Sequence, residues 1–188
     1  MTLPELKTRR LVLRPLTAGD ADAIANLAGR DFRIVRWMTS FSWPYVEGTA
    51  ERFIAAQDHA DPLKSQATYA VTLGGVFIGL MALQAPGDIR EEPKCPTLGY
   101  WFGWPFQGFG YGTEAARAVI EWGFEAFDCE AIAARVFEDN AASRALLRRI
   151  GFEPVAVTQR FSKALDRRVP NVVVRLDREV FEAERAAA

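Results

Sequence analysis

Residues 104–115 read WPFQGFGYGTEA, a stretch in which Gly108, Gly110 and Gly112 alternate with aromatic residues directly before a helix-like run. Glycine has no Cβ atom, so such a loop brings bare backbone N–H groups close to a ligand. The N-terminus of a following helix favours an anion at the same place. A simple turn would use these glycines equally well, so the choice depends on the surrounding sequence.

Two well-known phosphate loops do not fit this stretch. The P-loop pattern GxxxxGK[ST] fails because no lysine follows the last glycine. The dinucleotide pattern GxGxxG fails because Thr113 stands where the third glycine is required. The remaining pattern is QxxGxG, formed by Gln107, Gly110 and Gly112. By itself this pattern is compatible with a structural turn as well as with an anion site.

The loop lies between a predicted strand and a predicted helix. Residues 97–102 (TLGYWF) have the composition of a strand, and Thr113–Phe127 carries its apolar residues on one helical face. Residues 131–137 (AIAARVF) are predicted to form the next strand. A strand–loop–helix–strand order predicts that the two strands are parallel neighbours.

Further elements are predicted on both sides of this unit. Strands are expected at residues 9–14, 68–73, 76–83 and near 152–158 and 170–176, and helices at 17–29, 47–58 and 140–150. Gly74-Gly75 predicts a hairpin turn, and Asn140 and Gly151 are typical of the two ends of a helix. The chain is therefore expected to form one mixed α/β domain over residues 1–188, with a core from 9 to 176 and a frayed AERAAA tail.

The composition excludes several classes of protein. The 188 residues are 49% hydrophobic and 25% charged, with a formal net charge of −1. No basic excess indicates a nucleic-acid partner, and no apolar run is long enough to span a bilayer. The first residues lack the apolar segment of a signal peptide. We therefore expect a cytoplasmic protein that binds neither nucleic acid nor membrane.

Histidine and cysteine are too scarce for most metal and triad chemistries. Cys95 and Cys129 are the two cysteines, and His59 is the single histidine. This number supports neither a disulfide framework nor a zinc site, so no metal is expected. His59 is expected to have a structural or solvated role.

Four segments together resemble the GCN5-related N-acetyltransferases (GNAT). They are RRLVLRPLTAGDA, IGLMAL, TLGYWFGWPFQGFGYGTEAARAVIEWGF and EDNAASRALLRRIGF, which fall within residues 9 to about 155. The branch most similar acetylates the N-termini of ribosomal proteins (RimJ/RimL-like). The resemblance implies the GNAT fold, a mixed central β-sheet of about six to seven strands flanked by about four helices. It also implies acetyl-CoA as co-substrate, an amine as acceptor, and a monomer or homodimer.

The resemblance assigns the glycine loop to the pyrophosphate of acetyl-CoA. The residues implied in cofactor binding are Trp101, Phe102, Gln107, Gly108, Phe109, Gly110, Tyr111, Gly112, Thr113, Asn140 and Ser143. Because Gln107 carries no formal charge, backbone N–H groups must supply more of the binding. The strand Tyr100–Phe102 is implied to pair with the pantetheine arm, with the N–H of Phe102 as an oxyanion donor. Most of the aromatic side chains of this strand are expected to pack in the core.

The proton donor departs from the common family pattern. Many members have a tyrosine as general acid at the position of Leu147, and a leucine cannot transfer a proton. In the resembled branch, a serine at the position of Ser143 donates to the leaving thiolate. Either Ser143 has this role, or the thiolate leaves unassisted, or the domain is not catalytic. Ser143 also suits an ordinary place in the first turn of a helix.

No strong general base is evident. Some members have a glutamate where this chain has Thr97; Glu138, next to Asn140, is a candidate instead. An acidic loop with Asp88, Glu91 and Glu92 also precedes the strand, although each acid suits a solvated surface equally well. An α-amine, with a pKa of about 7.7–8.0, is neutral at pH 7 roughly 300 times more often than a lysine at about 10.4. Weak base chemistry therefore favours an N-terminal α-amine as acceptor.

The aromatic segment WMTSFSWPY, residues 37–45, is implied to shape the acceptor site. Trp37, Phe41, Trp43 and Tyr45 are the candidate acceptor-binding residues. The alternatives are a loop folded over the core and a dimer contact.

Three functions remain open at this point. The first is an acetyltransferase acting on the N-terminal α-amine of a protein or peptide. The second is an acetyltransferase of a small amine such as an antibiotic or polyamine, which the near-neutral charge disfavours. The third is an acyl-CoA-binding module without turnover.

Overall fold

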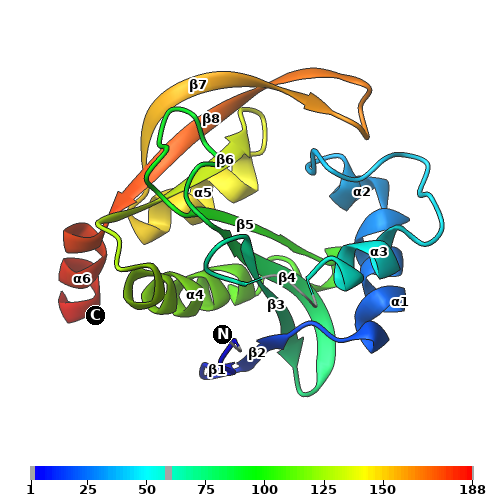
Figure 1. The fold of residues 1–188 in the computed structure, drawn as a ribbon, viewed down its shortest axis with the longest axis horizontal. Helices are drawn as coiled ribbons and strands as arrows, with labels where there is room; N and C mark the ends of the chain where they lie inside the picture. The colour runs from blue at the N-terminus through cyan, green and yellow to red at the C-terminus, as the bar shows by residue number, and fades with distance from the viewer. Residues whose placement is uncertain (1–2, 58–60, 188) are drawn as a thin grey trace.

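The computed structural model describes residues 3–57 and 61–187, and its centre is one eight-stranded sheet (Figure 1). The strand order is β1-β2-β3-β4-β5-β6-β8-β7. The strands are β1 (Leu6–Lys7), β2 (Leu11–Pro15), β3 (Gln66–Leu73), β4 (Val76–Gln84), β5 (Thr97–Phe102), β6 (Ala131–Phe137), β7 (Glu153–Ser162) and β8 (Arg167–Asp177). Only β5 and β6 are parallel neighbours among the described strands.

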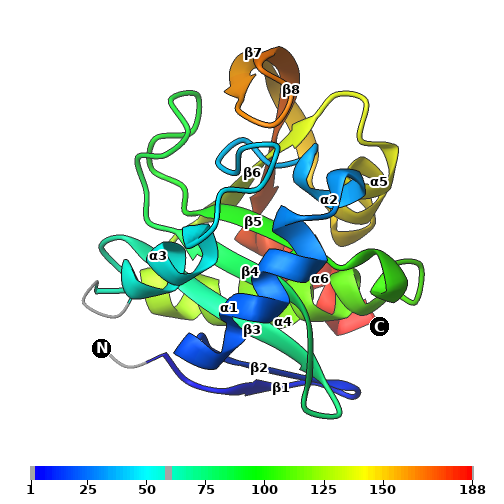
Figure 2. The same cartoon turned by 90° about the vertical axis from the view of Figure 1, so that its right-hand side faces the viewer.

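Helices cover both faces of this sheet, as the view in Figure 2 shows. They are α1 (Ala21–Ile24), α2 (Phe32–Val35), α3 (Thr49–Ala55), α4 (Tyr111–Phe127), α5 (Ala141–Ile150) and α6 (Arg178–Ala187). One core cluster packs α4, α5 and α6 against the sheet, and a second packs α1, α2 and α3 against the other face. Alternation along a strand serves both layers: Trp101 points into the second cluster, and Phe102 into the first.

The predicted α/β fold is confirmed, with one correction to the number of strands. The sheet has eight strands rather than six to seven, because the short strand β1 adds to the edge next to β2. The strands predicted at 97–102 and 131–137 coincide with β5 and β6, and their parallel pairing is confirmed. Strands β7 and β8 extend well beyond the predicted ranges and form a long hairpin.

The helices differ more from the sequence-based expectation. The helix predicted at 17–29 is divided into a 3₁₀ turn (Ala18–Asp20), α1 and a π segment (Ala25–Gly29), and the helix predicted at 47–58 shortens to α3. Helix α2 was not predicted. The tail expected to fray forms α6 instead, because Phe181 is buried against Phe124, with ring centroids 5.7 Å apart.

The divergence of β5 from β6 positions the functional site. Their register contains only Thr97 opposite Ala133 and Leu98 opposite Ala134, whereas β5 continues to Phe102 and β6 to Phe137. Beyond Leu98 the edge of β5 that faces β6 pairs with none of the described strands. The sheet is therefore split at its centre, between β5 and β6. The start of α4, the first turn of α5 and strand β7 line this split.

The remaining expectations concern His59, metal binding and membrane spans. His59 lies outside the described residues. Within residues 3–57 and 61–187, no group of three or more His, Cys, Asp or Glu side chains is placed to hold a metal ion. No helix in that part of the chain combines the length and apolar character needed to cross a bilayer.

Candidate active site

A cavity of about 1270 Å³ follows the gap between β5 and β6. Its lining begins at the N-terminus of α4, follows β5 and the first turn of α5, and continues to β7 and to the segment before α3. We call the part next to α4 the loop end, and the part lined by Gln84, Asp88, Arg135, Arg160 and Asn171 the far end. The cavity therefore joins a helix N-terminus to a polar chamber on the opposite side of the split.

The loop end presents backbone N–H groups. Gly108 and Gly110 have φ values of 85° and 80°, which favour glycine, and Gly110 begins α4 without any side-chain cap. In the described part of the chain, the N–H groups of Gly108, Phe109 and Gly110 find no backbone acceptor, and the first N–H groups of any helix have none within it. These groups and the helix dipole make the loop end a site for an anion such as a pyrophosphate.

Gly112, the third glycine, lines the cavity and also has a packing constraint. A Cβ atom on Gly112 would lie 2.7 Å from Leu146 Cδ1, so this glycine allows α4 to pack closely on α5. Gln107 also has a structural contact, because its Nε2 donates to the carbonyl of Phe102 at 2.9 Å. Phe109 has an exposed ring whose centroid lies 5.7 Å from that of Tyr111. Thr113, the residue after Gly112, lines the cavity.

The backbone of Phe102 faces the split in the sheet. Phe102 is opposite Gly79 in the β4–β5 register, and the next residue, Gly103, donates its N–H to Ile78 O at 3.0 Å. N–H directions alternate along a strand, so the N–H of Phe102 points away from β4 toward the gap. The side chains of Trp101 and Phe102 are both buried, which confirms the packing expected for most of this strand.

Asn140 and Ser143 lie together at the start of α5 and both line the cavity. Asn140 is the N-cap, and its Oδ1 accepts the N–H of Ser143 at 3.1 Å. The Ser143 hydroxyl is 2.8 Å from the hydroxyl of Tyr100, a residue that the sequence analysis placed in the strand without a polar role. Burial raises the pKa of Tyr100 to about 12, although its hydrogen bond with Ser143 lowers it in part. Tyr100 is therefore protonated at physiological pH.

The remaining acid and base candidates have contrasting environments. Leu147 is 2% exposed and belongs to the core below α5. Thr97 is also buried, and its hydroxyl has no hydrogen-bond partner in the described part of the chain. Glu138 lines a smaller neighbouring pocket rather than the cavity, and its carbonyl accepts a hydrogen bond from Arg144 at 2.9 Å.

The acidic loop before β5 is largely held by arginines. Asp88 lines the cavity but is ion-paired with Arg135, and its carbonyl accepts from Arg135 Nη1 at 3.1 Å. Glu92 binds Arg175 at 2.8 Å, and Glu91 is exposed outside the cavity. The sequence analysis did not single out Arg135. Its sequence signal is that it is the one charged residue in the otherwise apolar strand AIAARVF.

The aromatic segment divides into two pairs. Trp37 and Phe41 line the cavity, whereas Trp43 and Tyr45 are absent from its lining. The ring of Trp43 packs against that of Phe32 in a tilted arrangement, with centroids 5.2 Å apart, and Trp43 remains 40% exposed.

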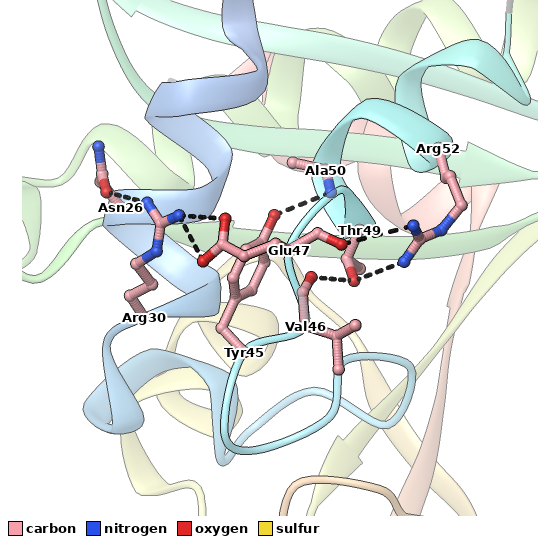
Figure 3. Close-up of polar contacts among 8 residues, drawn as sticks. All are labelled: Asn26, Arg30, Tyr45, Val46, Glu47, Thr49, Ala50 and Arg52. Carbon is pink, nitrogen blue, oxygen red and sulfur yellow. Dashed lines mark hydrogen bonds and ion pairs between the residues drawn. The ribbon is translucent and has the colours of Figure 1, made fainter.

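Tyr45 is part of a bonded loop that Figure 3 shows in detail. The N–H of Ala50 donates to its hydroxyl at 3.0 Å, and Arg30 lies over its ring while pairing with Glu47 (Figure 3). Tyr45 therefore holds the entry to α3 in place.

The chain is similar to known proteins in sequence and in fold. The chain is 26% identical over 161 residues to the uncharacterized N-acetyltransferase YoaA of Bacillus subtilis, covering 84% of this chain and 88% of YoaA. The structure of Mycobacterium smegmatis RimJ in complex with CoA-disulfide has a TM-score of 0.79 at 21% identity, covering 100% of this chain and 94% of RimJ. RimL, a ribosomal L7/L12 alpha-N-protein acetyltransferase solved with coenzyme A, has a TM-score of 0.75 at 17% identity, covering 93% and 98%.

The fold, the divided sheet and these relatives define the protein as an acyltransferase. The sequence matches the model of the acetyltransferase (GNAT) domain over residues 10–153, and the chain belongs to that family. The GNAT resemblance drawn from the glycine loop and its surroundings is thereby confirmed, and a binding module without turnover no longer needs to be considered.

Proposed function

We propose that the protein transfers an acetyl group from acetyl-CoA to the N-terminal α-amine of a protein or peptide. The observation that carries the proposal is the continuous cavity, which joins an uncapped helix N-terminus to a far end with hydrogen-bonding side chains. One substrate can enter from each end, and the two meet beside β5.

Acetyl-CoA is the substrate that suits the loop end. Its pyrophosphate would accept hydrogen bonds from the N–H groups between Gly108 and Thr113, with Gly112 contributing mainly through packing. Its pantetheine arm would lie along the unpaired edge of β5, with Asn140 and Ser143 on the other side. RimJ and RimL, which share the fold, were solved with CoA species.

The residues next to this arm support direct transfer. The neutral amine nitrogen attacks the thioester carbonyl carbon, and the oxygen that becomes negative accepts the N–H of Phe102. The C–S bond then breaks, and the thiolate takes the proton of the Ser143 hydroxyl. The proton lost by the amine passes to water, and water returns a proton to Ser143, whose hydroxyl is oriented by the 2.8 Å hydrogen bond with Tyr100.

The charges of the far end favour an α-amine over a polycation. Asp88 is the acid there and is paired with Arg135, while Glu138 lies outside the cavity lining. A lysine amine needs a strong base at neutral pH, whereas an α-amine is partly neutral without one. Polyamines and aminoglycosides need unpaired carboxylates, and among the described residues of the far end the one carboxylate, that of Asp88, is already paired.

Release of free CoA from acetyl-CoA tests the proposal. The acceptor panel contains peptides with free N-termini, N-blocked lysine peptides, polyamines and aminoglycosides, with buffer as background. Turnover is expected with free N-terminal peptides and is expected to fall on Ser143→Ala. Turnover confined to lysine peptides or small amines would reject the α-amine as acceptor.

A further inference from the structure

We propose that the far end binds a carboxylate of the acceptor through Arg160, so that the preferred acceptor is a peptide with Asp or Glu within its first few residues. This inference rests on the proposed transfer to an N-terminal α-amine. It adds a substrate preference that follows from the charges around one arginine.

Arginine dominates the charged lining of the cavity. Its charged members are Arg52, Asp88, Arg135, Asp139, Arg149 and Arg160. Of these, Asp88, Arg135 and Arg160 belong to the far end, whereas Asp139 and Arg149 lie just before and on α5. Two arginines and one aspartate give the far end an excess positive charge of one.

The single acid there is already neutralised. Asp88 and Arg135 are 17% and 16% exposed, and they are joined by an ion pair and by the bond to the Asp88 carbonyl. A partly buried carboxylate with such a partner is not available to hold the cation of a basic acceptor. The pair also fixes the Asp88 loop over the opening of the split.

Within residues 3–57 and 61–187, Arg52 has polar contacts but no ion pair. Its Nη2 donates to Thr49 Oγ1 at 3.1 Å and its Nη1 to the carbonyl of Glu47 at 3.5 Å (Figure 3). The carboxylate of Glu47 pairs with Arg30 instead. Among the described residues no carboxylate therefore pairs with Arg52, which lines the cavity.

Arg160 has the strongest reason to bind an anion. In residues 3–57 and 61–187 it makes no ion pair and no side-chain hydrogen bond, although it is half-buried in the cavity wall. Burial and the nearby charge of Arg135 lower its pKa, and Asp88 offsets this only in part. A guanidinium held this way gains most from a carboxylate that meets its planar donors.

The neutral lining beside Arg160 suits an extended peptide. Gln66, Gln84 and Asn171 offer amide groups, and Asn171 is 2% exposed with its Nδ2 bonded to Val169 O at 3.0 Å. Such side chains bind the main chain, while Arg160 selects an acidic side chain. A free amino acid offers the same carboxylate without the main chain, so the test must separate the two sources.

The experiment compares matched peptides with a free α-amine. At positions two to four, the acidic peptide carries Asp and Glu, the neutral peptide Asn and Gln, and the third peptide Lys. The kcat/KM for each peptide is measured at saturating acetyl-CoA. We expect about tenfold or more in favour of the acidic peptide. Arg160→Gln should remove this preference by raising KM for the acidic peptide, without changing KM for acetyl-CoA.

Two further variants sharpen the result. Arg168→Gln removes the same charge from an exposed position of the same hairpin that does not line the cavity, and it should leave the preference intact. Arg160→Glu should shift the preference toward the lysine peptide. A circular dichroism spectrum and a thermal unfolding midpoint equal to those of the unmodified protein show that Arg160→Gln is folded.

Equal kcat/KM for the acidic and neutral peptides would overturn the inference while leaving N-terminal acetylation standing. An equal loss of the preference with Arg168→Gln would reduce it to long-range charge. If no free N-terminal peptide is acetylated, the proposed function fails and the peptide preference with it. Acetylation of free amino acids but not their amides would then assign Arg160 to an α-carboxylate instead.

Discussion

The hydroxyl oxygens of Tyr100 and Ser143 lie 2.8 Å apart, between β5 and the first turn of α5. Both residues line the cavity. Burial raises the pKa of Tyr100 to about 12, so it keeps its proton and can donate to Ser143. A serine that receives one hydrogen bond is free to direct its own proton to a leaving thiolate. Tyr100 is thus a positioning residue for Ser143.

Loss of either hydroxyl is expected to slow the chemical step. Ser143→Ala should lower kcat by about 10² and Tyr100→Phe by about tenfold, since a general acid contributes 10²–10⁴. The double variant should be no slower than Ser143→Ala, because Tyr100 acts through Ser143. Single-turnover kinetics at saturating acetyl-CoA measure these rates. Multiplicative losses would show that the two hydroxyls act independently.

Substitution of Gly110 is expected to weaken acetyl-CoA binding. At a φ of 80°, Gly110→Ala costs about 1–2 kcal/mol and tilts the first N–H groups of α4. The new Cβ would lie 3.5 Å from Arg10 Nη2, an ordinary contact, so backbone geometry is the cause. We expect Kd for acetyl-CoA, measured by calorimetry, to rise about fivefold or more.

Gly74→Ala is the matched control for Gly110→Ala. Gly74 also has a positive φ, 56°, but lies in the β3–β4 turn with open space around it. Both variants should lose similar stability, and only Gly110→Ala should lose affinity. Equal affinities in the two variants would remove the loop from acetyl-CoA binding.

Local patterns were sufficient to predict the unit around the glycine loop. The strand at 97–102, the helix that follows it and the strand at 131–137 depend on apolar periodicity and on glycine, which act between near neighbours. The Asn140 cap and the αL conformation of Gly151 were predictable for the same reason.

Contacts between distant residues were beyond such patterns. Tyr100 and Ser143 are 43 residues apart, and their hydrogen bond depends on how α5 packs beside β5. The end of the β5–β6 register at Leu98, like the approach of Arg160 to Arg135, is a property of the assembled sheet. The family resemblance assigned the whole segment 37–45 to the acceptor site, and so included Trp43 and Tyr45 with Trp37. In the structure Trp37 lines the cavity, whereas Trp43 and Tyr45 do not.

Trp37 and Trp43 are expected to differ in their effect on the acceptor. Trp37 lines the cavity and packs edge-on against Phe137, with ring centroids 5.9 Å apart. Trp43 does not line the cavity and packs against Phe32. Trp37→Ala should raise KM for the peptide about fivefold or more, with little change for acetyl-CoA. Trp43→Ala, the matched control, should change neither constant. A larger effect of Trp43→Ala on peptide KM would restore that residue to the acceptor groove.

The Arg14–Asp20 pair is expected to give the protein acid-sensitive stability. Asp20 is 5% exposed, and its two oxygens each accept a 2.8 Å bond from Arg14. Burial raises the pKa of Asp20, but the bonds from Arg14 and Thr17 outweigh it, so the pKa is lowered overall. Stability from this carboxylate is therefore complete above its unfolded pKa of about 3.9, and is lost as the pH falls through the folded value.

Asp20→Asn tests this linkage by urea unfolding at several pH values. At pH 7 the variant should lose about 1–3 kcal/mol, because it leaves Arg14 without its charged partner. The difference from the unmodified protein should shrink as the pH falls below about 4, where Asp20 itself becomes protonated. Asp22→Asn, which changes an exposed acid two residues away, should show no such convergence. A difference that stays constant down to pH 2 would mean that Asp20 contributes through packing rather than through its charge, since only a charge is removed by protonation.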